Sequence, residues 1–275
     1  MRKAFLISAL CFAPAAAPAI AAGVSETLAP APHVSVKQRF DAIRRNDTRS
    51  FLRTMLSAEQ LDNMSAQWDA VRREKVSGDE SAQFRQTMAM LTAPGAEDVL
   101  MAMVRPQLAE MRQQMPMFVG MFGGMLQAGI QQDENMSADE KRKAGKAVQA
   151  ISTFLSENDL ADEASAEKAV GIVCSTARRL NLSTLEEAQR LNFNQLLQKS
   201  DILIGGLKEL FRVYGVDFDS WIDNVKTETV TQTADKATVR VHYEIFGIKD
   251  SVDEELVRQG RNWVSVKVAE ALAGN

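Results

Sequence analysis

The 275-residue chain has only two histidines and two cysteines, and it lacks the short motifs that mark common catalytic sites. There is no Gly-x-Ser-x-Gly elbow, no Walker phosphate loop, no His-Glu-x-x-His and no paired-cysteine metal site. Metal chemistry and histidine-based triads are therefore hard to assemble, and we expect no metal and no cofactor. The sequence specifies no reaction.

The chain also lacks a basic block. Its formal net charge is −4, which includes Arg2 and Lys3, and without these two residues it would be about −6. A mildly acidic chain without clustered lysines and arginines is a poor match for a phosphate backbone. We therefore expect that nucleic acid is not a partner.

The first 22 residues have the three parts of a secretory signal peptide. Arg2 and Lys3 precede an apolar run over Ala4–Phe12, and Ala19-Ile20-Ala21 matches an Ala-x-Ala cleavage site. We predict cleavage after Ala21 or Ala22 and a periplasmic or secreted mature protein. No transmembrane span is expected after cleavage.

Two other interpretations of this leader are weaker. The apolar run has about half of the ~20 residues that a membrane span needs, and prolines follow it. Lipidation at Cys11 is disfavoured because Leu10 stands where lipoprotein signals carry a small residue. We expect residues 23–35, which include Ala29-Pro30-Ala31-Pro32, to form a flexible linker.

Residues 36–275 are predicted to form a single α+β domain that is mostly helical. Apolar residues recur at helical spacing over 36–223, and serine-led capping boxes begin at Ser57, Ser137 and Ser183. The period changes to two near Val225, since Val239, Val241, Tyr243 and Ile245 alternate with polar residues. We expect a multi-helix body followed by a C-terminal antiparallel sheet of about four strands, a β-meander over 225–268.

An uncharged segment over 113–132 has the most unusual local composition. Methionines and phenylalanines alternate there with glycines, and Gly120 and Gly124 have the spacing that lets two helices approach closely. A transmembrane helix, a buried helical hairpin and an adaptable apolar groove are all compatible with this pattern. The candidate ligand-binding residues are Met117, Phe118, Met121, Phe122 and Met125.

Cys174 would be the only cysteine left in the mature chain. It lies in an apolar helical segment, and an exposed lone thiol outside the cytoplasm would be oxidised into mixed species. We therefore predict that Cys174 is buried. The alternative, a reactive nucleophile, would need a nearby histidine.

Three acidic residues, Asp217, Asp219 and Asp223, resemble part of a calcium loop. Trp221 and Ile222 stand, however, where an EF-hand needs an oxygen ligand and a glycine. Capping of a short helix before Val225 explains these carboxylates better.

Three segments near the two ends of the mature chain carry a family resemblance: the helix start over 39–47, the strand over 237–246 and the turn over 255–263 that ends at Trp263. They resemble the corresponding parts of exported NTF2-like (cystatin-like cone) proteins. The resemblance covers about a quarter of the mature chain, and the helical middle over 82–219 is far longer than that family's usual helix. The resemblance implies a curved sheet that closes over helices around an apolar cavity.

Two functional hypotheses follow. The first is an exported, non-catalytic envelope protein, a binding or scaffold module that offers the Met/Phe segment or a helix–sheet groove to a lipid-like small molecule or an envelope protein. The second is a small-cavity NTF2-like enzyme of the isomerase or dehydratase type, with His242 and Glu244 as acid and base. The first is favoured because no convergent set of catalytic residues appears.

Overall fold

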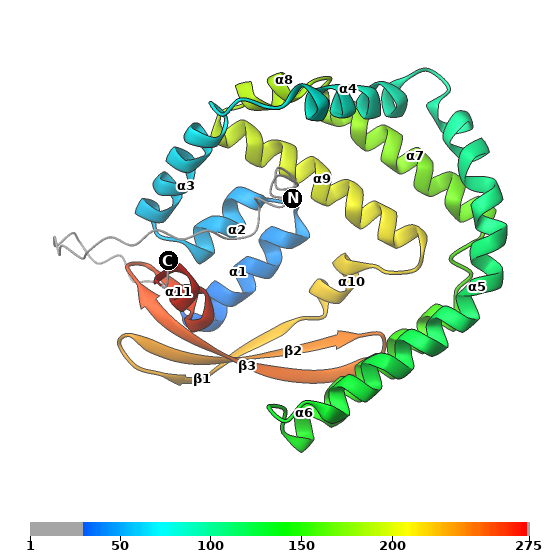
Figure 1. Ribbon diagram of the computed structural model, residues 1–275. Coiled ribbons are helices and arrows are strands. Elements are labelled where there is room, and N and C mark those ends of the chain that lie inside the picture. Colours follow the sequence, from blue (N-terminus) through cyan, green and yellow to red (C-terminus); the bar gives the residue numbers. More distant parts are fainter. Residues whose placement is uncertain (1–29, 274–275) are drawn as a thin grey trace. The chain divides into compact units, whose positions relative to one another are not determined.

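The computed structural model of the protein describes residues 30–273 (Figure 1). The predicted signal peptide over 1–22 and most of the predicted linker lie outside the described residues.

The described chain is α+β and mostly helical, as predicted. Ten helices precede a four-stranded antiparallel sheet of order β1-β2-β3-β4, and one helix follows it. The helices before the sheet are α1 (Pro32–Arg44), α2 (Thr48–Met55), α3 (Ala58–Val71), α4 (Gly78–Thr92), α5 (Ala96–Gln132), α6 (Ala138–Glu157), α7 (Glu163–Leu180), α8 (Leu185–Arg190), α9 (Phe193–Val213) and α10 (Phe218–Asp223). The remaining elements are β1 (Lys226–Gln232), β2 (Lys236–Ile245), β3 (Ile248–Gln259), β4 (Asn262–Ser265) and α11 (Val266–Ala273).

The contacts within the described chain separate it into two compact units. Unit 1 contains residues 30–68, 226–242 and 251–273, and unit 2 contains residues 69–225 and 243–250. The division falls inside α3, β2 and β3. No linker or change of composition accompanies these boundaries, so the sequence has no signal for them.

The first helix begins earlier than the sequence suggested. Residues from Pro32 onward, assigned to the flexible linker, are helical, because proline is well suited to the first helical position. His33 fixes this end to the sheet, since its Nδ1 lies 2.9 Å from Thr229 Oγ1 and its carbonyl accepts a hydrogen bond from Thr227 Oγ1. The N-terminal turn of α1 is thus part of the unit 1 fold.

Unit 1 packs α1 and α2 against one face of the sheet. Alternation along β2 buries Ala237, Val239 and Val241, and Leu256 and Val264 join them from β3 and β4. The burial of this face decreases toward the end of β2, where Ile245 is exposed. The last strand ends at Ser265 and α11 follows, where the sequence predicted a strand to 268, because the alanine-rich end of the chain favours helix.

Unit 2 is built on helix pairs, with α7 packed against α4, α5 and α9. One apolar cluster joins Met101 and Leu108 of α5 to Ala161, in the turn before α7, and to Ala166 of α7. Glycine permits the closest helix approach, since a Cβ added at Gly206 of α9 would lie 2.3 Å from Thr176 Oγ1 of α7. Gly206 is therefore a packing site inside one continuous helix.

Two predicted helix starts are confirmed, because the capping boxes at Ser57 and Ser137 both form. Asn181 ends α7 in the left-handed conformation. The box predicted at Ser183 does not form, because Thr184 is the residue that caps α8 and accepts the hydrogen bond from the Glu187 amide. The Glu187 carboxylate in turn accepts a hydrogen bond from the Ser183 amide.

An ion pair joins α5 to α7 and gives a pH prediction. The Arg178 guanidinium binds Glu97 through two hydrogen bonds of 2.5 and 2.9 Å. Together with the Glu97 backbone amide, they lower the pKa of Glu97 from 4.5 to about 2, against a small opposing effect of burial. A lowered carboxylate pKa contributes stability above the unfolded value, and this contribution is lost as the pH falls from about 4.5 to about 2.

We expect an NMR titration of the Glu97 carboxylate to show this low pKa, and Arg178→Gln to return it toward 4.5. Glu167→Gln, on the same helix as Arg178, is the control and should leave the pKa of Glu97 unchanged. A wild-type pKa near 4.5 would contradict the prediction.

Along the described chain, none of the helices combines the length and the hydropathy needed to cross a bilayer.

Candidate functional site

The five candidate ligand-binding residues lie on one exposed face of α5. Met117, Met121 and Met125 are 71, 67 and 62% exposed, and Phe118 and Phe122 are 49 and 38% exposed. The two phenylalanine rings stack with centroids 5.6 Å apart. These side chains form an open apolar face and line neither of the two hollows described below.

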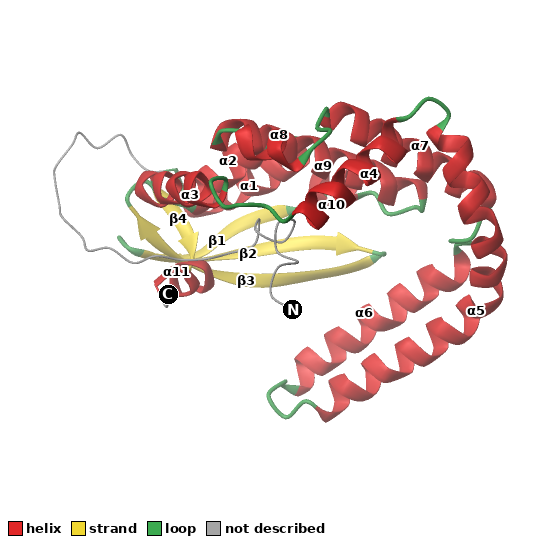
Figure 2. Cartoon of the chain, turned by 45° about the horizontal axis from the view of Figure 1, so that its top comes forward, coloured by secondary structure: helices red, strands yellow, loops and turns green. Residues whose placement is uncertain are grey.

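The helical hairpin suggested by the sequence is present, but this Met/Phe face is not its core. Helices α5 and α6 lie side by side (Figure 2). The face of α5 opposite the Met/Phe face packs against α6, and Val119 on that face is buried. The close approach is at Gly123, where an added Cβ would lie 2.9 Å from Ser152 Oγ. At Gly120 and Gly124, predicted to be the contact glycines, an added Cβ would meet nothing within 4 Å.

His242 and Glu244, the predicted acid–base pair, each interact with a different residue and not with one another. The His242 Nε2 lies 3.1 Å from Glu228 Oε1, and the His242 side chain is 47% exposed on the face of β2 opposite Val239 and Val241. Glu244 Oε2 lies 3.7 Å from Lys249 Nζ. His242 is thus solvated and paired across the β1–β2 ladder.

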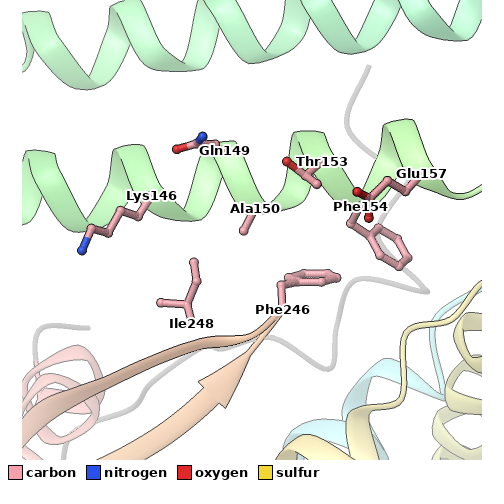
Figure 3. Close-up of a pocket in the computed structure, with 8 residues that line it drawn as sticks. All are labelled: Lys146, Gln149, Ala150, Thr153, Phe154, Glu157, Phe246 and Ile248. Atoms are coloured by element: carbon pink, nitrogen blue, oxygen red, sulfur yellow. The ribbon is translucent and has the colours of Figure 1, made fainter.

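A groove in unit 2 lies between α6 and the turn that joins β2 to β3 (Figure 3). It has a volume of about 500 Å³, and one side is formed by α6 residues at spacings of three and four. These are Lys146, Gln149, Ala150, Thr153, Phe154 and Glu157, and Phe246 and Ile248 form the other side.

The second wall of the groove is a two-residue hairpin turn. Phe246 and Gly247 connect β2 to β3 with φ values of 50° and 74°. Positive φ at both central positions is typical of a type I′ turn, which matches the twist of the paired strands. For a bulky residue such as Phe246 this conformation is strained by roughly 1–3 kcal/mol.

Aromatic contacts hold the strained turn in place. The Phe246 ring lies 4.9 Å from the Phe154 ring of α6 and 5.0 Å from the Trp221 ring of α10. Trp221 in turn contacts Phe218, which packs against Phe211 of α9. Because each such pair contributes about 0.5–1.5 kcal/mol beyond buried area, the ring series can offset the strain at Phe246.

Capping residues position the helix that carries Trp221. The Asp217 carboxylate accepts hydrogen bonds from the amides of Asp219 and Ser220, as expected from the sequence, and the Arg212 guanidinium binds both Asp217 and Asp219. Desolvation opposes ionisation of Asp217, but the amide bonds and Arg212 together lower its pKa. Asp217 therefore caps α10, as predicted, whereas Asp219 forms ion pairs with Lys208 and Arg212.

A salt bridge ties the two walls together beyond the rings. The Lys143 ammonium of α6 lies 3.4 Å from Asp250 Oδ1 at the start of β3, and this contact is the main cause of the raised pKa of Lys143. Phe154 and Lys143 thus fix the β2–β3 hairpin to α6 at two positions along the helix. These contacts lie within the chain, so the walls of the groove are positioned without a ligand.

The charges at the two ends of the groove are opposite. Figure 3 shows Lys146 at one end of the α6 row and Glu157 at the other, with Ala150 and Phe154 between them. Within residues 30–273, neither the Lys146 ammonium nor the Glu157 carboxylate has a hydrogen-bond or ion-pair partner. Both charges are therefore available to a ligand.

A second hollow lies in unit 1, between the β1–β2 hairpin and α11. Its volume is about 700 Å³, and its wall includes Thr231, Thr233 and Thr238. Their hydroxyls bind one another or the hairpin turn, with Thr231 Oγ1 3.1 Å from Thr238 Oγ1. The unit 2 groove, which has two aromatic rings in its walls, is the stronger candidate for an apolar ligand.

The sequence did not predict the ring partners of Phe154. The turn signal was present, since Gly247 stands between two alternating segments. Lys146 and Glu157 gave no signal, because isolated charges on a helix are usually solvated. Ile151, the α6 residue next to Ala150, is 40% exposed and does not line the groove.

The thiol of Cys174 is buried, as predicted, and it is free. Burial raises its pKa, and the nearby Glu97 carboxylate raises it further. Because the thiolate is the reactive form, the environment of Cys174 disfavours nucleophilic chemistry.

Searches with the chain matched no protein family model, no curated protein and no solved structure.

Proposed function

We propose that this protein is an exported, non-catalytic binding module of the cell envelope, and that the groove between α6 and the β2–β3 turn holds an apolar part of its ligand or partner. The observation that carries the proposal is the apolar lining of the groove by the half-buried side chains of Ala150, Phe154, Phe246 and Ile248, kept in place by ring contacts and by the Lys143–Asp250 pair. Ligand sites are typically concave, mostly apolar and largely preformed.

Export is supported by the sequence of the first 22 residues, with Arg2 and Lys3 before an apolar run and an Ala-x-Ala site. The Met/Phe face of α5 is a second apolar surface on the same helical hairpin and is a candidate contact for an envelope protein. His242 and Glu244 are engaged with Glu228 and Lys249, so no observation favours the acid–base enzyme.

The test is native mass spectrometry of the protein purified from its own envelope fraction. We expect the wild-type protein to start after Ala21 or Ala22 and to carry a bound apolar molecule or partner. Ala150→Trp should fill the groove and abolish retention. Ile151→Trp, at an exposed neighbouring position outside the groove, is the matched control and should retain it.

Circular dichroism of both variants should match the wild type. Equal retention by a folded Ala150→Trp variant would contradict the assignment of the groove. Recovery from the cytosol with Met1 in place would contradict export.

A further inference from the structure

The two unpaired charges of the groove, on Lys146 and Glu157, indicate which chemical class of ligand it binds. This inference rests on the proposed function. We infer that the groove takes a short, extended peptide segment with apolar side chains, whose carboxylate end lies at Lys146 and whose ammonium end lies at Glu157. The charges, the length and the surface between them each contribute to this assignment.

The length of the groove matches a short peptide. Lys146 and Glu157 are eleven positions apart on α6, which at about 1.5 Å per residue is roughly 16 Å. An extended peptide rises about 3.3 Å per residue, so about five residues span this distance. Alternate side chains of such a peptide point to the same side, toward the apolar surface of the groove.

The polarity of the surface also fits a peptide. Gln149 and Thr153 of α6 also line the groove, so its lining contains an amide and a hydroxyl group as well as apolar side chains. Peptide backbone groups need hydrogen-bond partners when they leave water. An α6 wall of this mixed composition can provide them.

Both end charges favour a dipolar ligand over an acyl chain. A fatty acid could pair its carboxylate with Lys146, but its hydrocarbon tail would then lie against the Glu157 carboxylate and hinder its hydration. A peptide places a cation there. The opposite charges therefore complement the two ends of one peptide chain.

The experiment titrates the mature protein with the probe peptide Ala-Leu-Ala-Leu-Ala and follows the backbone amides by NMR. Four forms of the peptide are compared: free at both ends, acetylated at the amino end, amidated at the carboxyl end, and capped at both. We expect shifts confined to α6 and the β2–β3 turn. The form with two free ends should bind most tightly.

The variants assign each end. Lys146→Gln should weaken binding of peptides with a free carboxylate by about threefold and leave the amidated forms unchanged. Glu157→Gln should weaken binding of peptides with a free amine by about threefold and leave the acetylated forms unchanged. Lys168→Gln and Glu167→Gln on α7 remove the same charges outside the groove and should have no effect. Both end effects should shrink in 0.5 M salt because exposed charges are screened.

The failures of this inference and of the proposed function are distinguishable. If the doubly capped peptide binds in the groove as tightly as the free one, the charge assignment is overturned and the apolar groove stands. If dodecanoate binds there more tightly than every peptide and Glu157→Gln does not weaken it, an acyl ligand replaces the peptide. If neither probe shifts the groove amides, the inference and the assigned groove both fall.

Discussion

Replacing Gly206 by alanine is expected to destabilise the α7–α9 pair by about 2 kcal/mol, although alanine is the better helix former. The added Cβ would lie 2.3 Å from Thr176 Oγ1 and 2.7 Å from Thr176 Cγ2. Rotation of Thr176 is opposed by its hydrogen bond from Arg179 Nη2. The two helices must therefore separate or the threonine must give up its rotamer.

Gly171→Ala is the matched control, because Gly171 lies on α7 and an added Cβ there would meet nothing within 4 Å. It should stabilise the protein by about 0.5–1 kcal/mol through helix propensity alone. Hydrogen exchange of the α7 and α9 amides measures both variants within unit 2. Thr176→Ala should restore part of the loss in the Gly206→Ala background, with a coupling energy of about 1 kcal/mol. A Gly206→Ala variant as stable as the wild type would contradict the packing described for α9.

Removal of the Arg39 guanidinium should have the largest effect on unit 1. Arg39 is 6% exposed, its Nη1 lies 2.7 Å from Glu254 Oε1, and its Nη2 donates to the Trp263 carbonyl. Arg39→Met keeps much of the apolar stem but leaves a largely buried carboxylate and a carbonyl without their donor. Because breaking one side of a buried ion pair typically costs about 3–5 kcal/mol, we expect a loss near 3 kcal/mol.

The control for Arg39 removes both charges. Arg39→Met combined with Glu254→Leu replaces the pair by apolar groups, and such replacements are often neutral or stabilising. We expect the double variant to be clearly more stable than Arg39→Met alone. Hydrogen exchange of the α1 and β4 amides reports the effect on unit 1. An undiminished stability of Arg39→Met would show that the pair contributes nothing to the fold.

Much of the fold was predictable because local rules decide it. The change of period near Val225 predicted the sheet, and β1 covers Lys226–Gln232 as expected. Capping chemistry located several helix starts, because a serine and an acidic or amide side chain three residues later satisfy the same free amides wherever they occur. Asn181 ended its helix for a similarly local reason.

The groove was not predictable in the same way. Phe246 and Phe154 are 92 residues apart, and no local pattern shows that a hairpin turn will pack its ring on α6. The Met/Phe segment attracted attention by composition, yet composition does not say which face of α5 meets α6. Gly123, whose surroundings are crowded, and Gly124, whose surroundings are open, have the same sequence context. The resemblance to NTF2-like proteins stays a prediction.

The interleaving of the two units has a consequence for the order in which the chain can fold. The Trp263 indole donates to the Pro30 carbonyl across 233 positions of sequence, and unit 1 takes its strands from the last quarter of the chain. Most of unit 2, by contrast, is contained in the continuous stretch 69–225. Contacts between distant positions are slow to form because a long loop must close first. During synthesis, which proceeds from the amino end, residues 69–225 can therefore fold before the strands of unit 1 have been made. Helices α1 and α2 can pack against the sheet only after those strands are complete.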